Sequence, residues 1–463
     1  MGRSIVRAPA QSVRPAQGAL RELPCYRVPG DGLEMGASFG NAKCWVTTRG
    51  NGDIERLFSV DLGMNVYGAL ALRYAAPAAQ PAASSPTSSM GTAPAVMRGA
   101  RRLEEAQTPL SPQGPGEFKL HPAYQRRTIE LPNRLHLSET IFVPKTSGPE
   151  RSVTYDGPVV YQLVEIENGA PQPQRVTVYG YAQLRGQTPL DMIATFDPGV
   201  RSGALLAHNA SHPDWVRLFG LAGDGQQLSG YATTLDAIDS YALTAVYPLQ
   251  NAAASTGDLV GVLQVDIDLA PGGRRRFGFV AVFSVAGAQE ARRLFAHAWD
   301  IEAALADTVA YYTRMASISE VMTPDATLNE GVVWAKANML RVMADFPRGR
   351  AFTNDPGVSS HVVGRDAAWF TYGCDYLLPE FSRALLDSFA ARQDANGKII
   401  EYYDAITDAR TDYGLNINDN TPLFIVAVDH HYRVTGDARY VERIYPVVAR
   451  AAQYLLSQLD TNL

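Results

Sequence analysis

Acidic and aromatic side chains gather in two long loops in the C-terminal third of the chain. The loop over residues 347–364 leads to Asp366, and the loop over 394–418 leads to Asp419. Carboxylates can bind hydroxyl groups or protonate a glycosidic oxygen, and aromatic rings can stack on the apolar face of a pyranose. This mixture predicts a sugar site, to which the loops also contribute His361, Glu401, Tyr402, Tyr403, Asp404, Asp408, Asp412 and Tyr413.

Asp366 and Asp419 also have a purely structural interpretation. Each precedes an apolar helical segment, and aspartate is a good helix N-cap. A helix N-terminus favours the charged carboxylate, whereas a proton donor must be protonated. Asp419 could therefore serve as a general acid only if burial or a second carboxylate nearby favoured its protonated form.

The sequence around these loops has a helical period, and the connections between the expected helices alternate in length. One helix is expected over 366–375 and another from Pro379, joined by a tight connection at 377–379. A further helix over 419–434 turns tightly at 435–437 into the last one. Because long and short connections alternate, the long loops should collect at one end of an all-helical region, where sites are often found.

From about residue 34 to 284 the dominant period is two, which is typical of strands. Apolar residues alternate with polar ones over 263–269, and again over 164–167 before a turn at 168–169. Residues 277–285 are apolar on both faces, as expected of a central strand between two sheets. Strands at this spacing, with no helices between them, predict an antiparallel β-sandwich.

These patterns divide the 463 residues into four parts. The sandwich should contain a low-complexity insertion, because the 23 residues from Ala75 to Met97 carry no charge and 16 of them are Ala, Pro or Ser. One long helix over 289–315 is expected to connect the layers. The expected parts are a disordered or extended tail (1–30), a β-sandwich with an insertion at 75–116 (31–286), a linker helix (287–322) and the first part of a helical domain (323–463).

Four segments within residues 328–459 have a recognisable order and spacing, namely Gly364-Arg365-Asp366, 394–399, 419–424 and 431–437. Together they resemble the glycogen-debranching, amylo-1,6-glucosidase-like enzymes, which are six-hairpin (α/α)6 glycosidases. Residues 139–144 and 165–178 resemble, more loosely, the sandwich beside such barrels. The resemblance implies a multidomain β + α fold, in which the sandwich and a linker helix precede an (α/α)6 barrel that is incomplete in this chain.

The resemblance also implies inverting cleavage of an α-glucosidic linkage in an oligo- or polysaccharide. Asp419 falls where the family places its general acid. An inverting enzyme also needs a base carboxylate roughly 6.5–9.5 Å from the acid. Fewer helices follow Pro324 than a complete barrel contains, so the base is expected outside the residues shown. The substrate-binding residues implied by the resemblance are Arg365, Asp366, Trp369, Tyr403 and Asn420.

Two alternatives to a glycoside hydrolase stay open. A truncated chain that lacks the base would be a non-catalytic carbohydrate-binding protein. A barrel of the same class in which phosphate replaces the base and its water would be an inverting glycoside phosphorylase.

Composition excludes several other classes of protein. Charged residues make up 19% of the chain and the net charge is −6, so we expect neither a nucleic-acid-binding protein nor an acidic disordered one. The longest apolar stretch, Phe277–Ala288, is shorter than the roughly 20 residues that cross a bilayer, so no membrane partner is expected. Three cysteines are too few for a disulfide framework and favour a reducing, cytoplasmic compartment.

No cofactor or metal is expected either. Asp429-His430-His431 carries metal-ligating side chains in close succession, but adjacent histidines on a helix should point to different faces. It also lacks a third ligand at helical spacing, so a packed or solvated pair is the expectation. The oligomeric state cannot be read from the sequence.

Overall fold

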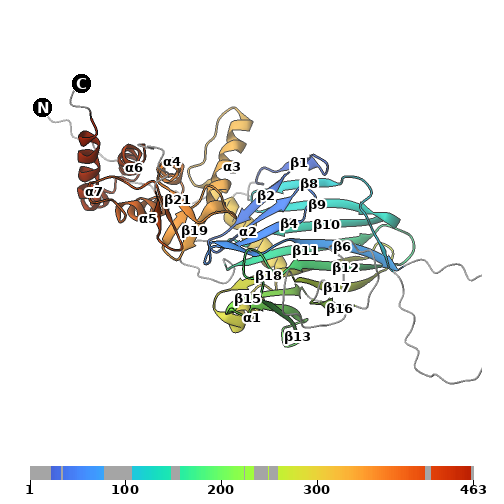
Figure 1. The fold of residues 1–463 in the computed structure, drawn as a ribbon. Coiled ribbons are helices and arrows are strands. Elements are labelled where there is room, and N and C mark those ends of the chain that lie inside the picture. The colour runs from blue at the N-terminus through green and yellow to red at the C-terminus, as the bar shows by residue number, and fades with distance from the viewer. Residues whose placement is uncertain are drawn as a thin grey trace, which may run out of the picture.

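The computed structural model describes residues 22–32, 35–77, 107–146, 157–223, 225–233, 249, 259–411 and 419–459. In these residues the chain forms two stacked antiparallel sheets with a helical part at one end (Figure 1). Most of the expected tail and insertion, and the candidates Asp412 and Tyr413, lie outside the described residues.

The first sheet, sheet A, has nine strands, and a short 3-10 helix (Pro132–Arg134) connects two of them. Tyr26–Pro29, expected in the tail, form its edge strand β1. In spatial order the strands are β1 (Tyr26–Pro29), β8 (Glu117–His121), β9 (Tyr124–Leu131), β10 (Leu135–Phe142), β11 (Val159–Asn168), β18 (Arg274–Ser284), β15 (His212–Ala222), β14 (Ala204–Asn209) and β13 (Met192–Asp197).

Sheet B is also built from nine strands. Part of the expected insertion belongs to it, because Ala75–Pro77 close β6 and Gln107–Pro109 pair with them as β7. Its main order is β16 (Gly230–Ala232), β17 (Val260–Leu269), β12 (Gln174–Gln183), β6 (Leu70–Pro77), β4 (Ile54–Ser59), β3 (Cys44–Arg49) and β2 (Met35–Gly40), with β5 (Met64–Tyr67) on β4 and β7 (Gln107–Pro109) on β6.

The expected alternation produces the core between the sheets. Leu263, Val265 and Ile267 of β17 pack there against Phe277 and Phe279 of β18. This burial of apolar area is the main force that holds the two sheets together.

Strand β18 is apolar on both faces, but it does not lie between two sheets. Its outer face carries Val280 and Val282. These residues belong to a second core, which they share with Leu294 and Ile301 of the two helices that follow β18. The expectation of a sheet on each side was wrong, because apolar helices and an apolar sheet cover a strand face equally well.

The segment from Glu165 to Val178 is not a strand pair within one sheet. Strand β11 pairs with β10 and β18, whereas β12 pairs with β17 and β6. The turn after Asn168 therefore carries the chain from sheet A to sheet B. A turn signal alone does not distinguish a hairpin from a crossing between sheets.

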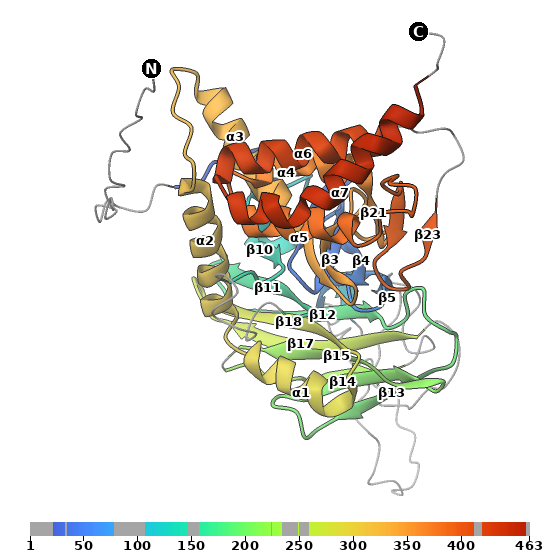
Figure 2. The same ribbon diagram turned by 90° about the vertical axis from the view of Figure 1, so that its left-hand side faces the viewer.

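The single connector helix expected over 289–315 is two helices, α1 (Gly287–His297) and α2 (Ile301–Ser317). Asp300 causes the break, since its side chain accepts a hydrogen bond from the amide of Ala303 and caps α2. Helix α1 covers β15 and β18, and α2 continues toward the helical part (Figure 2).

The sequence predicted an all-α helical part, and this was wrong because two small sheets form within it. The sheets pair β19 with β20, and β22 with both β21 and β23. The elements are α3 (Ala326–Val342), β19 (Met343–Phe346), β20 (Gly349–Phe352), β21 (His361–Val363), α4 (Gly364–Cys374), α5 (Pro379–Ala390), β22 (Tyr402–Asp404), β23 (Arg410–Thr411), α6 (Asn420–Thr435) and α7 (Ala438–Ser457).

Two details of these helices concern their caps and buried faces. The side chain of Asp325 caps α3. Helix α7 continues through Pro446, and its buried residues include Tyr440 and Ile444, whereas Tyr445 is exposed. None of the described helices is both long enough and apolar enough to cross a bilayer.

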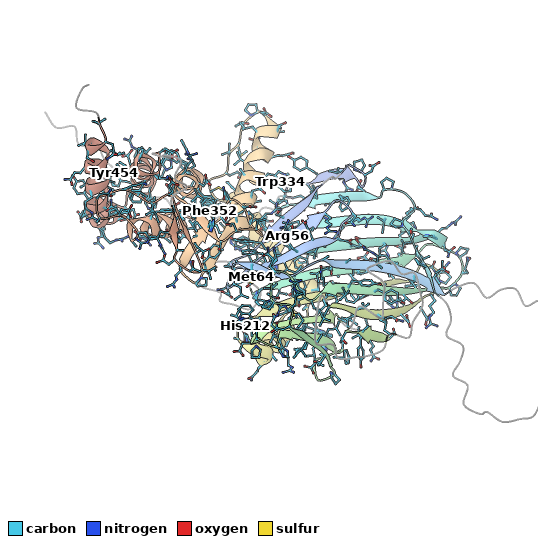
Figure 3. All side chains as sticks on the ribbon, viewed as in Figure 1. Arg56, Met64, His212, Trp334, Phe352 and Tyr454 are labelled. Carbon is cyan, nitrogen blue, oxygen red and sulfur yellow. The ribbon has the colours of Figure 1, made fainter. Side chains whose placement is uncertain are left out.

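Close contacts join the helical part to the sheets. The amide of Asp345 donates to the carbonyl of Ala42, and the rings of Trp45 and Phe346 lie 5.8 Å apart. In Figure 3, Phe352 lies on the helical side of this junction and Arg56 on the sheet side. The scaffold beneath the two long loops is therefore continuous with the sandwich.

Candidate active site

The two long loops meet in the small sheet of β21, β22 and β23. Strand β21 is the end of the first loop, and β22 lies inside the second. The amide of Gly364 then donates to the carbonyl of Glu401 at 2.7 Å, and the amide of Ile399 donates to Oγ1 of Thr421 at 3.1 Å. These bonds hold the beginnings of α4 and α6 together.

Gly364 allows α4 to begin close to α6. A β-carbon at this position would lie 2.9 Å from Oδ1 of Asn420 and 3.0 Å from the carbonyl oxygen of Ile400. Such contacts are too close for a side chain. The glycine before Arg365 therefore sets how near the first turn of α4 comes to the second loop.

This approach places Arg365 directly on Asp419. Nε of Arg365 lies 2.7 Å from Oδ2 of Asp419, and Nη2 lies 3.0 Å from Oδ1. The contact is bidentate, the geometry in which a guanidinium binds a carboxylate best. Both side chains are more than two-fifths exposed, so the pair stands at the surface and within reach of a ligand.

Neither aspartate acts as a helix cap. Asp419 occupies the N-cap position of α6, and yet its side chain accepts no hydrogen bond from an amide of that helix. Asp366 lies inside the first turn of α4, whose N-cap is Val363. The structural interpretation of these two acids as caps is therefore wrong.

Asp366 is the third charged group of this cluster. Its partial burial raises its pKa, the nearby Arg365 works against that rise, and the charge of Asp419 adds to it. The pKa of Arg365 is raised in turn, chiefly by its hydrogen bond to Asp419 and less by Glu401. The four charges therefore influence one another although they come from two separate loops.

The remaining candidates divide between surface and core. Trp369 lies one turn beyond Arg365 on α4, is 56% exposed and has its ring 5.4 Å from that of Tyr372. Tyr403, in contrast, is buried: its hydroxyl donates to Oγ of Ser388 and its ring lies under Arg392. The structure thus leaves the ring of Trp369 exposed one turn beyond Arg365 and keeps Tyr403 in the packing against α5.

Asn420 is buried beside the cluster. No hydrogen-bond donor among the described residues reaches its Oδ1. Glu401 is one of the loop acids that the sequence predicted near the sugar site, whereas Gly364 was not among the predicted site residues. Its position directly before the Arg-Asp pair was the signal that could have found it.

His430 and His431 do not point apart as expected. Their Nδ1 atoms lie 2.8 Å and 2.7 Å from the two oxygens of Asp375, whose side chain is fully buried. The carboxylate sits where both rings can reach it, and the trio ties α6 to the end of α4. In the part of the chain that the structure describes, no group of three ligating side chains is arranged to hold a metal ion.

Comparison with known proteins adds to this geometry. No family model matches the chain, and no curated protein matches it. A solved structure from the human microbiome, provisionally named a kojibiose phosphorylase, superposes with a TM-score of 0.56 over 93% of this chain at 10% identity. The fold is shared. The chain spans 59% of that protein's length, and at this identity the likeness shows the β-sandwich and helical architecture alone.

Proposed function

We propose that this chain carries the sugar-binding residues and the proton donor of a glycoside hydrolase of the six-hairpin (α/α)6 class. The enzyme cleaves an α-glucosidic linkage with inversion. Asp419 protonates the glycosidic oxygen, Arg365 and Asp366 bind hydroxyls of the terminal sugar, and Trp369 offers an exposed ring to its apolar face.

The contact between Arg365 and Asp419 carries this proposal. Two loops that are far apart in the sequence deliver a bidentate, exposed ion pair to one point, with Asp366 beside it and the exposed Trp369 one turn further along α4. Neither acid caps a helix, so helix formation does not explain their presence there. Exposed charged side chains beside an exposed ring are suited to binding a polyhydroxyl ligand.

The role of Asp419 requires that its protonated form be accessible. Asp366 is a second carboxyl beside it, and its own pKa is raised by burial and, to a lesser extent, by the charge of Asp419. Arg365 holds Asp419 in a bidentate ion pair. A sugar whose hydroxyls accept the guanidinium donors would release Asp419 toward the glycosidic oxygen.

Phosphorolysis is the second candidate function. The provisional name of the solved neighbour favours it, since a phosphorylase uses phosphate where a hydrolase uses a base and water. A non-catalytic sugar-binding protein is the third. A cytoplasmic setting is proposed for any of the three, since three cysteines are too few for a disulfide framework.

One experiment separates these functions. The protein at its full natural length is incubated with maltose, isomaltose and kojibiose, with and without inorganic phosphate, and the products are followed by proton NMR. Release of β-glucose without phosphate supports the proposal, and β-glucose 1-phosphate formed only with phosphate supports phosphorolysis. Sugar binding without any product would contradict both enzymatic functions.

A further inference from the structure

A cavity of about 730 Å³ lies in the sandwich, where the last strands of the two sheets meet. It is formed by β13 at the edge of sheet A, by β16 at the edge of sheet B and by the loop segments 198–203 and 225–229. Trp299, between α1 and α2, completes it. The volume falls within the range of ligand pockets.

Three aromatic rings line this cavity. Phe196 and Tyr231 stack with their centroids 3.6 Å apart, which joins the two sheet edges. The guanidinium of Arg201 lies 3.9 Å from the centroid of Trp299. All three rings are half-buried, so each is both anchored in the protein and in contact with solvent.

The polar lining is neutral, apart from Arg201. Amide and hydroxyl groups donate and accept hydrogen bonds, as sugar hydroxyls do. Several glycines leave backbone groups uncovered along the wall. The polar lining residues are Ser202, Gln226, Gln227 and Ser229, and the glycines are Gly203, Gly223, Gly225 and Gly230.

The turn over 198–203 is shaped around the aromatic wall. Ser202 and Gly203 both have positive φ, at 65° and 78°, which is uncommon for a serine. A β-carbon on Gly203 would lie 2.3 Å from Cζ of Phe196. Glycine is therefore needed for the turn to close over the ring.

We infer that this cavity is a second saccharide site, which binds part of a neutral glucose oligomer. Aromatic rings supply apolar surface for pyranose faces, and the amides, hydroxyls and backbone groups match sugar hydroxyls. A phosphorylated or acidic ligand fits less well, because Arg201 is the only charged side chain among the described lining residues and it is stacked on Trp299.

The cavity is separate from the cluster of Arg365, Asp366 and Asp419. In Figures 1 and 2, β13 lies far from α4 and α6, at the other end of the molecule. The second site would hold a long substrate on the enzyme without taking part in cleavage. Only the choice of a glucose oligomer rests on the proposed function.

The test is calorimetric titration of the full chain with maltoheptaose. Tyr231→Ala and Gln227→Ala should each weaken binding, the former by about tenfold or more. Gln227 is exposed, so its truncation leaves the packing intact. Tyr445→Ala, which removes a 63% exposed ring from α7, is the matched control and should bind as the unmodified chain does.

Arg365→Gln distinguishes the two sites. If the inference holds, this variant retains the binding that Tyr231→Ala loses. Absence of any heat of binding with maltoheptaose would overturn the inference. So would unchanged affinity in both cavity variants combined with loss of binding in Arg365→Gln, although the proposed function would then stand. Melting temperatures of all variants serve to exclude unfolding.

Discussion

Arg365 donates two hydrogen bonds to Asp419, with its Nε 2.7 Å from Oδ2 and its Nη2 3.0 Å from Oδ1 of the carboxylate. One residue begins α4 and the other precedes α6. The small sheet of β21 and β22 joins their loops, so the pair results from backbone pairing as much as from charge. Under the proposed function, this contact is where a sugar would meet both helices.

Replacing Asp419 with asparagine tests its role directly. Asp419→Asn should lower kcat by about 10²–10⁴-fold, the usual contribution of a general acid, because an amide cannot protonate the leaving oxygen. The KM should change little. The measurement is steady-state cleavage of an α-glucoside by the full-length protein. Asp429→Asn on α6, which is exposed and paired only to Arg433 in the described contacts, is the control. Near-normal turnover in Asp419→Asn would remove it from this role.

Asp366 should make stability depend on pH in a characteristic direction. Burial raises its folded-state pKa, so the folded protein holds this proton more tightly than the unfolded chain does. The contribution of Asp366 to the free energy of unfolding is favourable below the pKa of an aspartate in the unfolded chain, about 3.9, and it is lost as the pH rises through the higher pKa of the folded state. Asp366→Asn should therefore be slightly more stable than the unmodified chain at pH 7, and the gain should be small because the side chain is only partly buried.

Urea unfolding at pH 7 and pH 4 measures this difference. The advantage of Asp366→Asn should shrink at pH 4, where more of the native carboxyl is already neutral. An equal advantage at both values would show that burial of the charge is not its cause.

Gly364 should tolerate no side chain without harm to the site. In Gly364→Ala the new β-carbon meets Asn420 and the carbonyl of Ile400, so the first turn of α4 must shift. We expect sugar affinity to fall at least about tenfold, since small displacements of positioning groups are costly. Titration calorimetry measures it. Gly331→Ala on α3, where a β-carbon meets nothing within 4 Å, is the control and should bind normally.

The sequence was informative where one interaction dominates. The alternation over 263–269 correctly predicted a half-buried strand, because the free energy gained by burying one apolar face exceeds the other local preferences of the backbone. The alternation of long and short connections correctly predicted that Asp419 lies near Asp366. The prediction holds because α4 and α6 pack against each other and begin at the same end of the helical part.

Other features depend on partners that local sequence does not specify. Whether β11 and β12 share a sheet is decided by their neighbours β18 and β17, which lie some hundred residues later. The two histidines of α6 meet because Asp375 lies between them, and nothing within α6 shows this. The sequence could thus predict which loops and which residue types lie together, whereas it could not predict the actual hydrogen-bond partners.

The three thiols should differ sharply in reactivity. Cys44 and Cys374 are fully buried, and burial raises the pKa of Cys374 to about 12, whereas Cys25 is partly exposed. The thiolate is the reactive form. One thiol should therefore react with a disulfide reagent in the native protein at pH 8, and all three after unfolding. Cys25→Ser should abolish the native reaction; a remaining reactive thiol would contradict the burial of the other two.

Arg217 should be a major source of sandwich stability, because its guanidinium is buried and donates four hydrogen bonds. Nε donates to the carbonyl of Val66, Nη1 to Asn209 and the carbonyl of Trp215, and Nη2 to Thr188. Burial lowers its pKa to about 10, so it stays charged at neutral pH. Arg217→Met leaves these buried acceptors without a donor and should cost about 3 kcal/mol.

Arg217→Lys discriminates between charge and geometry as the source of that stability. A single ammonium keeps the charge but cannot reach acceptors arranged around a planar fork, so most of the loss should persist. Urea unfolding gives the free energies, with the half-exposed Arg175→Met as the control. If Arg217→Lys is as stable as the unmodified chain, the buried charge matters and the directed hydrogen bonds do not.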